Sequence, residues 1–148
     1  MFIIAAAALA ALNPLGFFSG ATHGTGTVKI MFRARQPFRV SSHGRPDGRG
    51  GIHLDQTVFQ ANEPAKVRHW DLRPTSPTTL VGSLSPDAVG PVSGTMSNDV
   101  LRIAYIMKGG LSVAQTLKLL PNGVLANHMS IKKLGMTVAT VDERITKE

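Results

Sequence analysis

The chain has 148 residues, about the length of one domain, and 43% of them are hydrophobic, so we expect one packed fold and exclude disorder of the whole chain. It has no cysteine, which excludes disulfides, thiolate nucleophiles and cysteine-ligated metal sites. The formal net charge is +7, but only 5% of the residues are aromatic, fewer than a base-stacking sheet needs, so no nucleic-acid partner is expected.

Residues 1–12 form an uninterrupted apolar run, and no charged residue precedes Lys29. The run is shorter than the roughly 20 residues that span a bilayer, and it is similar in length to the apolar core of a secretory signal. A signal normally begins with Lys or Arg, which this run lacks. We expect either an atypical signal peptide, with the protein in the periplasm or associated with the cell envelope, or a retained apolar helix.

Breaks containing Gly, Pro or Asn recur along the rest of the chain, and the segments between them are rich in Val, Ile, Leu and Thr. This pattern is typical of short antiparallel strands joined by hairpins, and closure removes the exposed edges of such a sheet. We predict an all-β fold: a single antiparallel up-and-down β-barrel of about 8–10 strands, preceded by the short apolar segment. The expected strands are 24–33, 36–45, 51–60, 65–73, 78–84, 88–96, 99–108, 111–120, 123–132 and 136–146.

Odd-numbered positions carry most of the apolar side chains in the last strands, so we expect them to face the core. Tyr105, Gln115 and Asn127 are polar members of this inward face. They are candidates for orienting a ligand, because small-molecule pockets are mostly apolar with a few placed polar groups. The alternative is that they satisfy one another in a filled interior.

Hairpin loops predict the pairing of these strands. A loop centred on Asn122 joins the expected strands 111–120 and 123–132, and one centred on Gly110 joins 99–108 and 111–120. The expected cross-strand pairs are Leu117 with Asn127, Gln115 with Met129, and Tyr105 with Gln115.

Histidines and carboxylates also meet in the predicted sheet. A loop centred on Gly48 would place His43 opposite His53, and the next hairpin would bring His69 close to Asp55. Such pairs are zinc ligands in some proteins, but no fixed metal-binding spacing is present, so we expect neither metal nor cofactor. Gly24-x-Gly26 and Gly48 to Gly51 lack the helix and glycine spacing of a nucleotide site and are interpreted as turns.

Short motifs follow one another from residue 17 to residue 146: FFSG at 17–20, THGTG at 22–26, LDQTV at 54–58, WDLR at 70–73, GPVSG at 90–94, IAYIMKGG at 103–110, PNG at 121–123 and KLG at 133–135. In this order they resemble an uncharacterised family of bacterial domains of unknown function grouped with the lipocalin-like (calycin) barrels. The resemblance implies that residues 17–146 form such a barrel, with Phe17 and Phe18 plugging one end or filling its core. It implies no activity.

We therefore expect noncatalytic binding of a small apolar or amphipathic ligand in the barrel. The candidate contacts are Tyr105, Gln115, Asn127, Trp70 and Arg68.

Two other functions compete with ligand binding. The first is a structural protein of the envelope or one that contacts an anionic lipid surface, through Arg33, Arg35, Arg39, Arg45 and Arg49. The second, less expected, is a barrel enzyme acting on a small lipophilic substrate with polar residues in its interior, such as Tyr105, Gln115 and Asn127, or Arg68 with Asp55. No catalytic residue is assigned, because neither a nucleophile elbow nor a catalytic triad is recognisable.

Overall fold

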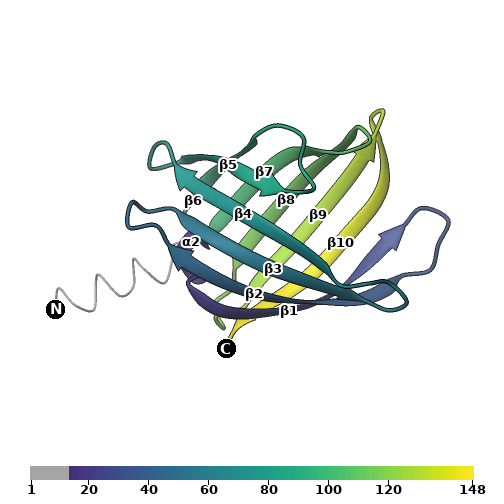
Figure 1. Ribbon diagram of the computed structural model, residues 1–148, viewed down its shortest axis with the longest axis horizontal. Coiled ribbons are helices and arrows are strands. Elements are labelled where there is room, and N and C mark those ends of the chain that lie inside the picture. Colours follow the sequence, from purple (N-terminus) through teal and green to yellow (C-terminus); the bar gives the residue numbers. More distant parts are fainter. Residues whose placement is uncertain (1–13) are drawn as a thin grey trace.

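Ten antiparallel strands follow one another through residues 14–148, the part of the chain that the computed structural model describes (Figure 1). The predicted signal peptide or helix at residues 1–12 lies outside these residues. Within them, no helix is long and apolar enough to cross a membrane. The elements are α2 (Pro14–Phe17), β1 (Gly20–Ile30), β2 (Gln36–Pro46), β3 (Ile52–Gln60), β4 (Lys66–Pro74), β5 (Thr79–Ser85), β6 (Val92–Ser97), β7 (Val100–Met107), β8 (Leu111–Leu119), β9 (Leu125–Lys133) and β10 (Met136–Lys147).

Each strand pairs with the next along the chain, and β1 pairs with β10 to close the barrel. The closing register runs from Thr22 opposite Lys147 to Ile30 opposite Ala139. Closure satisfies the backbone of the first and last strands, which would otherwise be open edges. The predicted fold, an all-β, lipocalin-like up-and-down barrel, is confirmed.

Side chains alternate between the interior and solvent along every strand. Even-numbered residues face inward in β1 to β6, and odd-numbered residues face inward in β7 to β10, as predicted for the last strands. The change of parity occurs at the two-residue turn after Ser97, which pairs with Val100. Gly24 and Gly26 belong to the inward face of β1, so their interpretation as turn residues is wrong.

The predicted register of β8 and β9 is confirmed: Leu117 lies opposite Asn127, and Gln115 lies opposite Met129. The predicted pairing of Tyr105 with Gln115 is wrong. The three-residue loop between β7 and β8 is centred on Gly109 and not on Gly110, so Tyr105 pairs with Val113 and Gln115 with Ile103.

The predicted pairing of His43 with His53 is also wrong. His43 pairs with Asp55, and His53 pairs with Arg45. The loop is centred on Arg49, because the Asp47 carboxylate accepts hydrogen bonds from the backbone N–H groups of Arg49 and Gly51, at 2.7 and 2.9 Å. This side-chain-to-backbone bonding fixes a longer turn than the glycines alone suggest.

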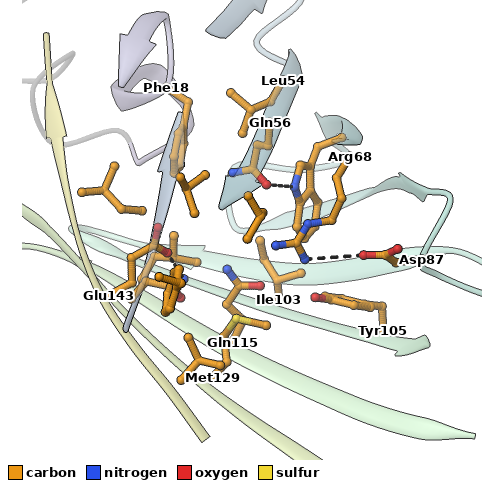
Figure 2. A pocket seen from close by; sticks show the side chains of 18 of the residues that line it. Phe18, Leu54, Gln56, Arg68, Asp87, Ile103, Tyr105, Gln115, Met129 and Glu143 are labelled. Atoms are coloured by element: carbon orange, nitrogen blue, oxygen red, sulfur yellow. Dashed lines mark hydrogen bonds and ion pairs between the residues drawn. The ribbon is translucent and has the colours of Figure 1, made fainter. Parts of the chain in front are cut away.

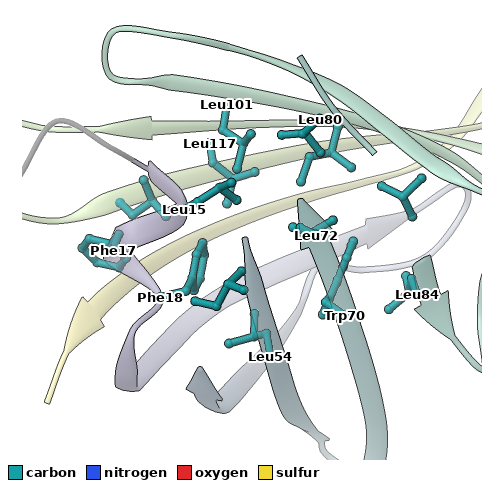
Figure 3. Packing of buried hydrophobic residues seen from close by; sticks show 14 of the residues in the cluster. Leu15, Phe17, Phe18, Leu54, Trp70, Leu72, Leu80, Leu84, Leu101 and Leu117 are labelled. Atoms are coloured by element: carbon teal, nitrogen blue, oxygen red, sulfur yellow. The ribbon is translucent and has the colours of Figure 1, made fainter. Parts of the chain in front are cut away.

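Buried apolar side chains fill the end of the barrel where α2 lies, which we call the closed end (Figure 3). Leu15, Phe17 and Phe18 are buried there, and the two phenylalanine rings meet edge to face with centroids 5.6 Å apart. Lys147 on β10 holds α2 and the residues after it against the barrel, because its Nζ donates hydrogen bonds of 2.7 Å to the carbonyl oxygens of Phe17 and Ser19.

Candidate functional site

A cavity of about 280 Å³ occupies the barrel interior, which we call the lumen. At the closed end, inward residues such as Leu54 and Leu72 are buried, whereas Phe38, Val58 and Met107, near the opposite end of the barrel, are only half-buried. We call this opposite end, formed by loops 31–35, 61–65, 108–110 and 134–135, the open end (Figure 1). Most of the cavity lining is apolar, as in small-molecule pockets.

Polar side chains from several strands project into this apolar cavity (Figure 2). All five of the ligand contacts expected from the sequence, Tyr105, Gln115, Asn127, Trp70 and Arg68, line it. Sequence reasoning missed five further polar or charged lining residues: Gln56, Gln60, Lys66, Asp87 and Glu143. The parity of β10 was the available signal for Glu143, because it is odd-numbered like the inward residues of β7 to β9.

Arg68 and Asp87 meet where the barrel wall is incomplete. β5 and β6 are short, so Arg68 on β4 has no paired residue on β5, and Tyr105 on β7 has none on β6. The segment after β5 fills the space through backbone hydrogen bonds from Val89 to Ile106 and from Lys108 to Asp87, at 2.8 and 3.2 Å. It brings Asp87 Oδ2 to 3.6 Å from Arg68 Nη1, inside the cavity lining.

Trp70 and Tyr105 form one side of the cavity, with ring centroids 5.6 Å apart at an edge-to-face angle. Trp70 Nε1 donates a hydrogen bond of 2.7 Å to Gln56 Oε1. Burial raises the pKa of the Tyr105 hydroxyl to about 12, while the Arg68 charge opposes this rise and Asp87 adds to it. Tyr105 is therefore a neutral hydrogen-bond donor at physiological pH.

Glu143 stands on another side of the cavity, on β10. Burial raises the pKa of its carboxyl group, and a hydrogen bond of 2.9 Å from Asn127 Nδ2 to Glu143 Oε1 partly opposes this rise, as does the Arg68 charge. The other carboxylate oxygen lies against Gly24, where a Cβ atom would clash with it. The missing side chain on β1 is thus what gives the Glu143 carboxyl group its room.

Four buried polar atoms of the cavity wall have no hydrogen-bond partner within the described part of the chain: Arg68 Nε, Tyr105 Oη, Gln115 Oε1 and Asn127 Oδ1. Tyr105, Gln115 and Asn127 are only 4%, 8% and 5% exposed. Buried polar groups normally have a hydrogen-bond partner, and a bound molecule or ordered water in the cavity would supply one to these atoms. The arrangement differs from the alternative of a filled interior in which the three residues satisfy one another.

Histidine–carboxylate pairs occupy the outer surface of the barrel. His69 Nδ1 lies 2.7 Å from Asp55 Oδ1 across β3 and β4, as the sequence predicted, and His53 contacts Asp71 in the same sheet. Because Asp55 points outward, it does not share the lumen with Arg68, and the suggested pairing of these two residues in an enzyme site is wrong. Between residues 14 and 148, no group of three or more His, Asp or Glu side chains is placed to bind a metal.

The five arginines considered for anionic surfaces do not form one patch. Arg33 and Arg35 are in the loop at the open end, whereas Arg45 and Arg49 are near the closed end. Arg39 lies on the wall between them, with its guanidinium 4.0 Å from the centroid of the Phe59 ring. Arg35 and Arg45 also lie 3.8 and 3.9 Å from carboxylates, those of Asp142 and Asp55.

Residues 5–147 match the family described as "Protein of unknown function (DUF3833)". The chain belongs to the DUF3833 family. This match confirms the resemblance to a domain-of-unknown-function family, and the barrel confirms the lipocalin-like fold expected for it. No curated protein matches the sequence.

Two solved structures share the barrel of this DUF3833 protein. The crystal structure of Rv2717c from M. tuberculosis has 13% sequence identity and a TM-score of 0.68, covering 93% of this chain and 97% of that one. The S-type phycobiliprotein lyase CPES from Guillardia theta has 8% identity and a TM-score of 0.70, covering 90% of each chain. At these identities the similarity establishes the fold alone.

Proposed function

We propose that this DUF3833 protein binds one small apolar or amphipathic molecule in the lumen and does so without catalysis. The observation that carries the proposal is an apolar cavity of about 280 Å³ whose wall presents four unpartnered polar atoms. This volume is close to the lower end of the about 300–1,000 Å³ typical of ligand pockets. One of the barrels with a similar fold is a phycobiliprotein lyase, which agrees with the handling of a small ligand.

The chemistry of the lining supports binding over catalysis. No histidine or cysteine lines the cavity within residues 14–148. Of the charged lining groups, Arg68 and Asp87 face each other, Lys66 Nζ lies 3.8 Å from Glu63 Oε2, and Glu143 accepts a hydrogen bond from Asn127. None of these groups forms the pair of nucleophile and general base that covalent catalysis requires.

The proposed location is the periplasm or the cell envelope, and the support for it is the apolar run of residues 1–12. N-terminal sequencing of the mature protein from a Gram-negative host tests this location. Removal of the run is the expected result, and an intact Met1 would contradict export.

Mass spectrometry of organic extracts from the purified protein tests the proposal and would identify the ligand. Gln115→Leu and Asn127→Leu are expected to change which molecules co-purify, because each replaces an unpartnered polar atom by apolar surface. Thr116→Leu, on the outer face of the same strand as Gln115, serves as the control and leaves the extract unchanged. Identical extracts from all four proteins would contradict the proposal.

We further propose that the open end contacts an anionic membrane surface. Phe32 and Leu134, which stand in the β1–β2 and β9–β10 loops, are 95% and 98% exposed. β1 and β10 are neighbours, so both loops lie at the same end of adjacent strands. Arg33, Lys132 and Lys133 flank these apolar residues, and this combination of exposed apolar and basic side chains fits an interface with anionic lipid.

Vesicle sedimentation tests this contact, using phosphatidylcholine with and without phosphatidylglycerol. Phe32→Ser with Leu134→Ser, and Lys132→Glu with Lys133→Glu, are each expected to reduce binding to the anionic vesicles. The control is Arg49→Glu with Lys118→Glu, which makes the same change of charge near the closed end. Equal loss from both charge-reversed proteins would show that net charge, and not the open end, governs binding.

A further inference from the structure

We infer that the ligand carries a carboxylate group, which Arg68 and Tyr105 hold on their side of the lumen in exchange for Asp87. This inference rests on the proposed function and gives it a ligand class. It is based on which buried atoms lack partners and on the sign of the charges beside them.

The guanidinium of Arg68 has unused hydrogen-bonding capacity. Its Nε is buried without a partner, and its ion pair with Asp87 has an N–O distance of 3.6 Å. Charge-assisted hydrogen bonds between such groups are shorter, about 2.7–2.9 Å, and a guanidinium commonly binds a carboxylate through two parallel N–H groups. Arg68 can therefore hold a carboxylate more closely than it holds Asp87.

The Tyr105 hydroxyl is a second donor without an acceptor. The residue is 4% exposed, and Figure 2 shows its hydroxyl end directed into the cavity, in the direction of the Arg68 guanidinium. Burial keeps the hydroxyl protonated, with a pKa of about 12. A carboxylate at this place receives one neutral and one charged donor, both already buried, and so satisfies groups that would otherwise remain unpaired.

The other side of the cavity would not accept a carboxylate. Gln115 Oε1 and Asn127 Oδ1 are unpartnered acceptors, and the carboxyl group of Glu143 lies beside Asn127. These acceptor oxygens and the Glu143 carboxyl group disfavour an anion there, but they suit a hydroxyl or amine donor of the ligand. This difference between the two sides fixes the orientation of the ligand, with its anionic end toward Arg68.

Asp87 is the group that the ligand replaces. It belongs to the segment after β5 that closes the gap between β4 and β7, and its side chain is partly exposed, at 36%. Its charge can therefore return to water when a ligand carboxylate takes its place. Because Asp87 competes for Arg68, its removal strengthens the binding of a carboxylate, whereas removal of Arg68 weakens it.

Decanoate and 1-decanol are the probes, since they differ in the polar end and share the apolar chain. Trp70 is the only tryptophan of the protein and lines the cavity, so its fluorescence reports binding to delipidated protein. We expect decanoate to bind about tenfold or more tightly than decanol. Tyr105→Phe and Arg68→Gln are each expected to remove about tenfold of the decanoate affinity and to leave the decanol affinity unchanged.

Asp87→Asn is the decisive variant, because its expected effect is opposite to that of Tyr105→Phe and Arg68→Gln. It is expected to raise the decanoate affinity and to leave the decanol affinity unchanged. The double variant Arg68→Gln with Asp87→Asn avoids an unpaired buried charge and is expected to bind decanoate as weakly as Arg68→Gln does. Arg102→Gln, on the outer face of β7, is the matched control and leaves both affinities unchanged.

The outcomes separate the carboxylate inference from the proposed function. Equal binding of the two probes to the wild type, with no effect of Asp87→Asn, overturns the inference while ligand binding in the lumen stands. Failure of both probes to bind overturns the proposed function and the inference with it.

Discussion

Asn127 and Glu143 face each other across β9 and β10, and Asn127 Nδ2 donates a hydrogen bond of 2.9 Å to Glu143 Oε1 inside the lumen. The amide partly offsets the loss of solvation that raises the pKa of the Glu143 carboxyl group. Two consequences can be measured, one through the pH dependence of stability and one through the neighbouring Gly24.

Glu143→Gln is expected to be more stable than the wild type at neutral pH, with the difference vanishing in acid. In the unfolded chain this carboxyl group ionises near its ordinary pKa of 4.5, but burial raises the pKa in the folded state. Below pH 4.5 the group is protonated in both states. As the pH rises from there through the folded-state pKa, the folded protein retains a proton that the unfolded chain has lost, and stability falls.

Thermal unfolding of the wild type and Glu143→Gln from pH 4 to pH 8 measures this difference. The substituted amide keeps an acceptor oxygen for Asn127, so the comparison isolates the charge. A stability difference that does not change with pH would show that the carboxyl group ionises alike in the folded and unfolded states.

Gly24→Ala is expected to destabilise the protein by about 1–3 kcal/mol, because the added Cβ would overlap the Glu143 carboxylate. The nearest atoms to that Cβ all belong to Glu143, so the cost should largely disappear when Gly24→Ala is made together with Glu143→Ala. Chemical denaturation of the two single variants and the double variant gives the coupling. Additive losses would mean that another neighbour resists the methyl group.

Phe18→Ala is expected to lower the free energy of unfolding by about 3–5 kcal/mol, the usual cost of removing a buried phenylalanine ring. Phe18 is 6% exposed, whereas Phe32, at 95%, offers a matched control. Phe32→Ala should change the free energy by no more than about 0.5 kcal/mol. Similar losses from the two substitutions, measured by urea unfolding, would contradict the packing seen at the closed end.

His69→Gln is expected to raise the pKa of the Asp55 carboxyl group toward its ordinary value of 3.8. The hydrogen bond from His69 is the main cause that holds this pKa below that value. Any stability that Asp55 contributes is present above pH 3.8 and is lost as the pH falls through the folded-state pKa. Carboxyl-carbon NMR titration measures the pKa, with His128→Gln, on the distant β9, as a control that leaves Asp55 unchanged.

The strand pattern was readable from the sequence because alternation and turn residues are local properties. Each of the ten expected strands has its counterpart, and parity placed Tyr105, Gln115 and Asn127 on the inward face. The loop at Asn122 also gave the correct register of β8 and β9. The register of β2 and β3 was wrong because the Asp47 carboxylate holds a longer loop between them, and that of β7 and β8 was wrong because their three-residue loop is centred one residue earlier, on Gly109.

What the sequence by itself determined is therefore the period of the strands and the identity of the polar groups on the inward face of the last ones. Only the tertiary structure decided which groups share the lumen, since closure of β1 on β10 brings Gly24 against Glu143, and a non-strand segment carries Asp87 to Arg68. The physical reason is that alternation along a strand depends on neighbouring residues, whereas closure and pairing depend on contacts between residues far apart in the chain.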